Sequence, residues 1–185
     1  TIKLAWIGNA GTLILLAGII GGFAQHMSIG EMISTLGQTL KNMWKAMVTV
    51  IAIIALAKVM GYSGMTTAIA TLLADLTGSI FPLFAPICGI LGTFVTGSTT
   101  SSGVLFAKMQ YEVAELIGAN PVMLVAANLA GGGIGKLISP QSIAIGVAAI
   151  GLEGSDGKIM TKTVGICIVL GVIVCIMSYL LAVVL

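Results

Sequence analysis

The sequence predicts an all-α, polytopic membrane protein with about three full transmembrane helices and two broken or re-entrant helical elements. Hydrophobic residues make up 58% of the chain, charged residues only 8%, and the mean hydropathy is +1.16. Because an ordinary soluble domain carries about 25% charged residues, a soluble fold could not solvate this surface. The apolar residues also form blocks long enough to cross a bilayer. We therefore expect residues 1–185 to form a single transmembrane domain.

Three apolar blocks predict the full spans, at residues 4–23, 44–61 and 164–185. At a rise of 1.5 Å per residue, about 20 residues cover the roughly 30 Å of hydrocarbon in a bilayer. Trp44 and Tyr62 flank the second block, where aromatic side chains favour the membrane interface.

Two shorter stretches lie between these blocks. Ser28–Leu40 alternates polar and apolar residues at helical spacing, which predicts an interfacial helix or a loop. Met65–Leu76 is short for a span, so we expect an interfacial or half-membrane element there.

Residues 81–117 and 121–151 are predicted to be interrupted helical elements. The first contains TGSTTSSG at Thr96–Gly103, and the second contains GGGIGKLISPQS at Gly131–Ser142. Glycine and hydroxyl residues are unfavourable in helix interiors, and non-helical backbone in a bilayer must be buried in protein or line an aqueous cavity. The alternatives are a Ser/Thr-rich surface loop for the first run and tight helix packing at small residues for the second.

The polar composition excludes several classes of function. All eight basic residues are lysines, scattered along the chain, which argues against a nucleic-acid partner. Cys88, Cys167, Cys175 and His26 show neither disulfide nor metal spacing, so we expect no metal and no cofactor. Neither a zinc-helix motif nor a G-x-S-x-G elbow is present, so the chain is not expected to be an enzyme.

Broken helices expose backbone groups that can bind ions. Ser101 and Ser102 precede a helix expected to start near Val104, and a second helix is expected to start near Ile143. Helix N-termini present N–H donors and a positive dipole end to an anion. Without arginine, a bound carboxylate must be met by such helix ends, lysine, hydroxyls or amides.

Lys136 lies between Ile134 and Ile138, where a charge is costly unless it is paired or hydrated. A lysine that extends from a surface loop to the membrane interface is the alternative. The string GIGK is not a nucleotide-binding loop, because Ala130 and Leu137 stand where that motif needs glycine and a hydroxyl residue.

Other polar residues in apolar surroundings leave their roles open. Asn128 is suited equally to a hydrogen bond between helices and to recognition of a substrate hydroxyl. Asp75, Glu112 and Glu115 are candidate proton carriers, although each is predicted to lie near the end of a segment.

Two stretches, GTFVTGSTTSSGVLF at Gly92–Phe106 and VAANLAGGGIGKLISPQSIAIGVAAIGLEG at Val125–Gly154, closely resemble the bacterial L-lactate permease family. The resemblance extends more weakly over most of the remaining chain. It implies a proton symporter for L-lactate, glycolate and related 2-hydroxy-monocarboxylates, with several passes through the bacterial cytoplasmic membrane. Family members are about three times longer, so it also implies the C-terminal part of a longer transporter whose N-terminal part is missing here.

The resemblance implies that substrate-binding residues lie in both breaks. They are Thr96, Gly97, Ser98, Thr99, Ser101, Ser102, Asn128, Gly132, Lys136, Ser139, Gln141 and Ser142. Two positions depart from the family pattern, because Asp is common where this chain has Thr99 and Asn where it has Gly103. An organic-anion carrier with different cargo or cation coupling is therefore one alternative, and a non-transporting membrane subunit is another.

Overall fold

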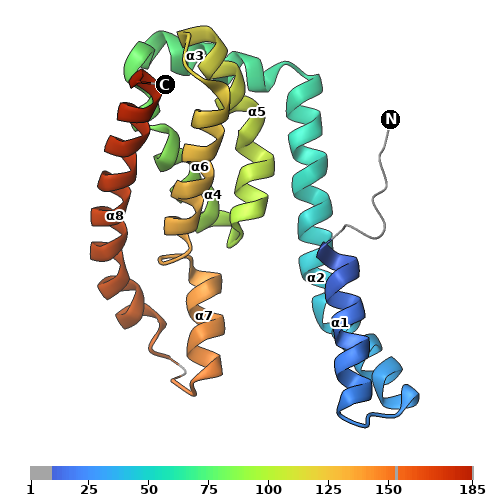
Figure 1. Ribbon diagram of the computed structural model, residues 1–185. Helices are drawn as coiled ribbons and strands as arrows, with labels where there is room; N and C mark the ends of the chain where they lie inside the picture. The colour runs from blue at the N-terminus through green and yellow to red at the C-terminus, as the bar shows by residue number, and fades with distance from the viewer. Residues whose placement is uncertain (1–9, 153, 185) are drawn as a thin grey trace. The chain divides into compact units, whose positions relative to one another are not determined.

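The computed structural model describes residues 10–152 and 154–184, and these are helices joined by short turns, without a strand among them (Figure 1). The all-α prediction is confirmed. Within this part of the chain, Met65–Leu83 and Asp156–Ala182 are long and apolar enough to cross a membrane, and two bent helix pairs raise the candidate spans to up to 4. The chain divides into two compact units after Thr49, and the single transmembrane domain stays a prediction.

The first unit contains α1 (Ala10–Ala24) and the beginning of α2 (Ile29–Tyr62). Residues 4–9 of the first predicted span lie outside the described residues. The turn before α2 is fixed by a capping box, in which the Ser28 backbone N–H and hydroxyl donate to Glu31 Oε2 at 2.7 and 2.8 Å. Helix α2 includes both the predicted interfacial segment and the predicted span from residue 44 to 61, because no glycine or proline separates them.

The second unit starts within α2 and continues with α3 (Met65–Thr77) and the 3-10 helix η1 (Gly78–Leu83). The prediction of a half-membrane element at Met65–Leu76 was too short, since α3 and η1 together form a segment of 19 residues that is apolar enough to cross. Pro82 is the fifth of the six residues of η1 and is buried, as is Phe81 beside it.

Helices α4 (Ala85–Thr96) and α5 (Thr99–Ile117) form an antiparallel hairpin. Only Gly97 and Ser98 separate them, so the expected break over Thr96–Gly103 and a helix start near Val104 were wrong. The hydroxyl residues fit into helix because they bond to nearby carbonyls: Thr96 Oγ1 donates to Gly92 O at 2.8 Å.

Asn120 caps α6 (Pro121–Gly135) by accepting from the backbone of Val122 and Met123, and Pro121 occupies the first helical position as predicted. Helix α7 (Pro140–Ala149) follows after a bend of 41°. The expected break beginning at Gly131 and helix start near Ile143 were therefore wrong, because non-helical backbone is confined to residues 136–139.

Three glycines of α6, Gly131, Gly132 and Gly135, pack directly on α4, which runs in the same direction. A Cβ on Gly131 would overlap the Pro86 carbonyl, and one on Gly135 would lie 2.5 Å from the Ile90 carbonyl oxygen. The alternative interpretation of the glycine run as tight helix packing is confirmed. Helix α5 runs antiparallel to α6, with Gly103 against Leu129.

Helix α8 (Asp156–Val184) lies along η1, α4, α6 and α7 (Figure 1). Near its middle, the Cys167 sulfur lies 3.9 Å from the Ile134 carbonyl oxygen, close to the end of α6. Residues 164–184 of the predicted span at 164–185 fall within this longer helix, and Leu185 lies outside the described residues. A separate core of Phe81, Val113 and Leu124, all fully buried, joins η1, α5 and α6.

Candidate substrate site

The two helix breaks meet in the second unit. Gly97 ends α4 in the left-handed conformation, with φ 69°, and its α-carbon faces the Gln141 side chain so closely that a Cβ would overlap Gln141 Oε1. Beside this contact, Thr99 Oγ1 donates to the Gly132 carbonyl oxygen at 3.3 Å. The tip of the α4–α5 hairpin thus lies against the α6–α7 break.

The position of the two helix breaks along the long helix α8 indicates their depth in a membrane. The contact between Cys167 and Ile134 places the end of α6 beside a residue eleven positions into α8, which continues to Val184. Because α8 is itself long enough to cross a bilayer, a break beside its middle lies near half the depth of such a span. This geometry favours substrate-lining breaks over surface loops.

Most hydroxyls of the first break are already hydrogen-bonded. Ser98 caps α5, its side chain accepting from the Ser101 N–H at 3.3 Å, and Ser102 Oγ donates to the Gly89 carbonyl at 3.3 Å. Ser101 and Ser102 are buried in the first turn of α5, and Thr96 spans the turn by donating to the carbonyls of Gly92 and Ser98. The hydrogen bonds of these residues stabilise the turn between α4 and α5.

The second break differs because its capping hydroxyl is free. Ser139 directly precedes Pro140, the first residue of α7, and its buried Oγ has no hydrogen-bond partner among the described residues. A serine at this position usually accepts from a backbone N–H of the first turn. Gln141 is exposed and Ser142 half-buried in that first turn, so the start of α7 keeps donors for a ligand.

The structure adds two polar residues that the sequence analysis did not select, Thr93 and Gln110. Both are fully buried, and Gln110 Nε2 donates to Asn128 Oδ1 at 3.4 Å. This bond shows that Asn128 joins α5 to α6, one of its two expected roles. Within the part of the chain that the structure describes, Thr93 Oγ1, Gln110 Oε1 and Asn128 Nδ2 nevertheless lack partners.

A periodic signal for both residues exists in the sequence. Thr93 follows Gly89 by four positions, and Gln110 follows Ser102 and Phe106 by eight and four, so each lies on the inward face of its helix. The chemical type of these side chains alone did not distinguish them from surface residues.

The charged candidate residues differ in their exposure and in their ion pairing. Lys136 is exposed at the end of α6, beside the break. Of the possible proton carriers, Asp75 and Glu115 are exposed, whereas Glu112 pairs with Lys108 at 3.4 Å and keeps one buried oxygen without a partner.

Comparison with known proteins decides the family. The protein-family model described as L-lactate permease matches residues 1–185 of the chain. The chain belongs to the L-lactate permease family. It is 39% identical over 96% of its length to the L-lactate permease of Bacillus subtilis (strain 168), of which it covers 31%. It is 42% identical over 97% of its length to the L-lactate permease of Escherichia coli (strain K12), of which it covers 33%.

A relative with a different printed substrate is also similar. The glycolate permease GlcA of Escherichia coli (strain K12) is 41% identical over 85% of the chain, which covers 28% of that protein. The chain thus spans about a third of the length of these curated relatives. No solved structure matches it.

Proposed function

We propose that this chain forms the substrate-binding part of a secondary carrier for L-lactate and related 2-hydroxy-monocarboxylates such as glycolate. The carrier works by proton symport in the bacterial cytoplasmic membrane. The observation that carries the proposal is the meeting of the α4–α5 tip with the α6–α7 break, beside two buried hydroxyls without partners, Thr93 and Ser139. The similarity to lactate and glycolate permeases supports the substrate class.

The carboxylate is assigned to the two helix starts. The first turns of α5 and α7 direct N–H groups and positive dipole ends towards the breaks, as in other carriers with discontinuous helices. Ser139 adds a buried hydroxyl, and Lys136 adds the positive charge. A lysine at this depth is stable only beside water, an anion or further protein, which favours a role for it in the transport pathway.

The substrate 2-hydroxyl is assigned to the face between α4 and α6. Thr93 lies one turn before the first break at Gly97, and Asn128 lies two turns before the second break at residues 136–139, on the facing helix. Each has a buried polar atom without a partner. A site that hydrogen-bonds a hydroxyl discriminates strongly against an analogue that lacks it.

Uptake of radiolabelled L-lactate into proteoliposomes tests this function. Under an inward proton gradient, the Lys136→Ala variant should raise KM at least about tenfold, since a charged hydrogen bond contributes about 1.5–3 kcal/mol. The exposed Lys162→Ala on α8 is the matched control and should leave uptake unchanged. Uptake of lactate at the wild-type KM by Lys136→Ala removes Lys136 from the site.

A second candidate is a carrier of organic anions coupled to another cation. It is favoured by Thr99, which donates to a carbonyl at the position where the family pattern noted in the sequence implies an Asp, and neither break contains a carboxylate. Uptake measured with a proton gradient alone and with a sodium gradient alone separates the two mechanisms. A reconstituted protein without uptake under either gradient favours a non-transporting membrane subunit.

A further inference from the structure

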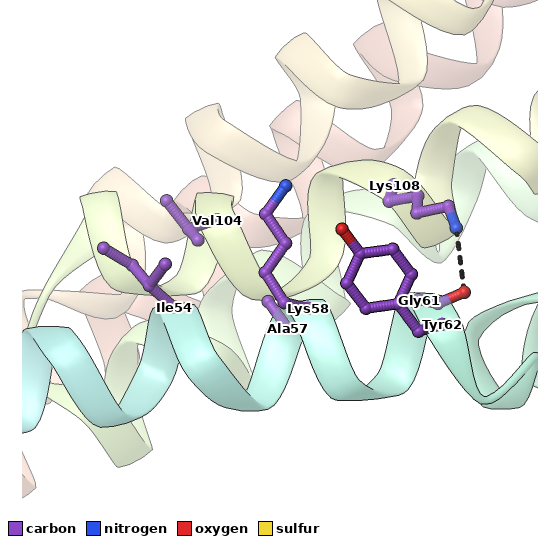
Figure 2. Close-up of a pocket in the computed structure, with 7 residues that line it drawn as sticks. All are labelled: Ile54, Ala57, Lys58, Gly61, Tyr62, Val104 and Lys108. Atoms are coloured by element: carbon purple, nitrogen blue, oxygen red, sulfur yellow. Dashed lines mark hydrogen bonds between the residues drawn. The ribbon is translucent and has the colours of Figure 1, made fainter. Parts of the chain in front are cut away.

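A pocket of about 350 Å³ lies between the second half of α2 and the middle of α5, on the surface of the second unit (Figure 2). Its walls include Ile54, Ala57, Lys58 and Tyr62 from α2, with Val104 and Lys108 from α5. None of these residues belongs to either helix break. The pocket is therefore separate from the proposed substrate site.

Both helices present the same order of side chains to the pocket. On α2, Lys58 follows Ile54 by one turn, and on α5, Lys108 follows Val104 by one turn. Lys108 Nζ donates to the carbonyl oxygen of Gly61, three residues after Lys58 on α2, at 3.4 Å, and Figure 2 shows Lys108 turned to Gly61 and Lys58 extending from α2 towards α5. The pocket is thus apolar at one end and cationic at the other.

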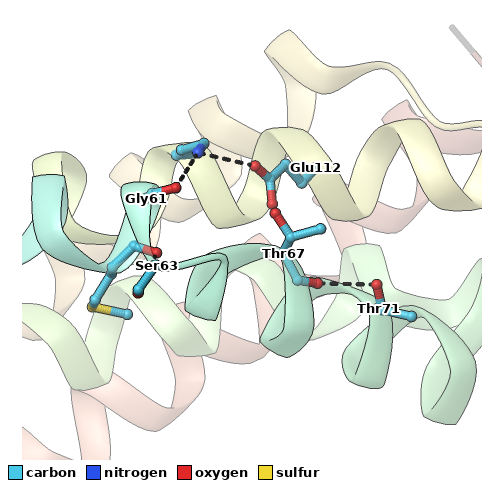
Figure 3. Close-up of polar contacts among 7 residues, drawn as sticks. Gly61, Ser63, Thr67, Thr71 and Glu112 are labelled. Carbon is cyan, nitrogen blue, oxygen red and sulfur yellow. Dashed lines mark hydrogen bonds and ion pairs between the residues drawn. The ribbon is translucent and has the colours of Figure 1, made fainter.

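The cationic end has more positive than negative charge. Glu112 Oε1 lies 3.4 Å from Lys108 Nζ, and in Figure 3 one amino group joins Gly61 to Glu112. These contacts occupy two of the three donors of the Lys108 ammonium. Within the described residues, Lys58 makes no hydrogen bond or ion pair. One carboxylate therefore faces two ammonium groups, and an anion would complete the pocket.

The depth of the lysines also points to a particular kind of anion. Lys108 lies nine residues after Thr99, the start of α5 at the hairpin tip, which corresponds to about 14 Å along the helix. A tip near the middle of the bilayer places this lysine near the edge of the hydrocarbon, about 15 Å from the midplane. Tyr62 beside it is 87% exposed, as expected for an aromatic side chain at the interface.

We propose that this pocket binds an anionic phospholipid. The phosphate lies between the ammonium groups of Lys58 and Lys108, and an acyl chain follows Ile54, Ala57 and Val104 towards the membrane interior. Basic pockets between transmembrane helices recognise anionic headgroups in this way. A free phosphate or small carboxylate would satisfy the lysines but leave the apolar half empty, whereas a lipid matches both ends.

The test measures phosphatidylglycerol bound to the purified, detergent-solubilised protein, by native mass spectrometry during titration with that lipid. Lys58→Gln should weaken binding about fivefold, and Lys58→Gln with Lys108→Gln about 25-fold, from roughly one ammonium–phosphate interaction per lysine. The control is Lys158→Gln with Lys162→Gln, which removes the same charge from exposed positions of α8. Phosphatidylcholine should bind wild type and variants equally weakly.

Two results would overturn the proposal. One is equal phosphatidylglycerol affinity in the Lys58→Gln variant and the α8 control. The other is displacement of the lipid by glycerol 3-phosphate at matched concentration, which would indicate a site for free anions. Because Lys58 has no partner within the described residues, Lys58→Gln should keep the wild-type melting temperature, so a loss of lipid is not a loss of fold. Neither result depends on which substrate is transported.

Discussion

Gly97 and Gln141 touch across two helix breaks that lie far apart in the sequence, so closely that any side chain on Gly97 would overlap the Gln141 amide. This contact links the tip of the α4–α5 hairpin to the first turn of α7. It makes the two breaks one structural feature, and the candidate site depends on it.

Gly97→Ala should destabilise the protein by about 2 kcal/mol or more. About 1 kcal/mol arises because an alanine disfavours the left-handed backbone, and the remainder arises from overlap with Gln141. Adding Gln141→Ala should recover only the stability lost to the overlap with Gln141, because the backbone strain at residue 97 remains. Thermal unfolding of the purified protein measures both, and an equal melting temperature for the single and double variants would show that Gln141 is not in contact.

Gly131→Ala should have a larger effect than Gly133→Ala, although the two glycines share one helix. A Cβ on Gly131 would overlap the Pro86 carbonyl, which belongs to backbone and cannot rotate away, whereas Gly133 has no atom within 4 Å. Overpacking costs about 1–3 kcal/mol, while alanine in place of an unhindered helical glycine gains about 0.5–1 kcal/mol. Opposite shifts in melting temperature are therefore expected, and the same sign in both would contradict the α4–α6 packing.

Gln110 and Asn128 should behave as a coupled pair. Their hydrogen bond, at 3.4 Å between two fully buried amides, predicts a coupling free energy of about 0.6 kcal/mol in a double-mutant cycle of Gln110→Ala and Asn128→Ala. Unfolding measurements on the four proteins give this value. Strictly additive effects would mean that each amide is stabilised by other groups.

The start of α2 should be sensitive to acid. The Ser28 N–H and hydroxyl donate to the Glu31 carboxylate and hold the pKa of Glu31 below its ordinary value. Because the folded state prefers the ionised form, its contribution is present above the usual pKa of a glutamate, about 4.3, and is lost as the pH falls through the lowered value. The protection factors of the amides of residues 29–32, which are corrected for the intrinsic pH dependence of exchange, should fall over that range, and Glu31→Gln should remove this fall.

The sequence predicted those features that depend on composition and on local chemistry. The apolar blocks indicated a helical membrane protein, and Pro121 marked a helix start that Asn120 caps. The two interruptions were also expected, because runs of glycine and hydroxyl residues weaken helices.

The extent of the interruptions depended on contacts that periodicity does not reveal. Gly131 and Gly135 remain helical because the α4 backbone lies against them, and Ser102 remains helical because its hydroxyl finds the Gly89 carbonyl. Thr93 and Gln110 were missed for a related reason. Their importance comes from atoms left without partners after packing, which only the folded arrangement shows.

The affinity of the Ser139→Ala variant for L-lactate, measured by equilibrium dialysis with radiolabelled substrate, tests the central claim most directly. The Ser139 hydroxyl has no hydrogen-bond partner in residues 10–152 and 154–184, so its removal should leave the melting temperature unchanged or higher. If the two breaks bind the carboxylate, the dissociation constant should rise at least about tenfold, the loss of one hydrogen bond to a charged group. A wild-type dissociation constant in this variant would contradict a carboxylate site at the α7 start.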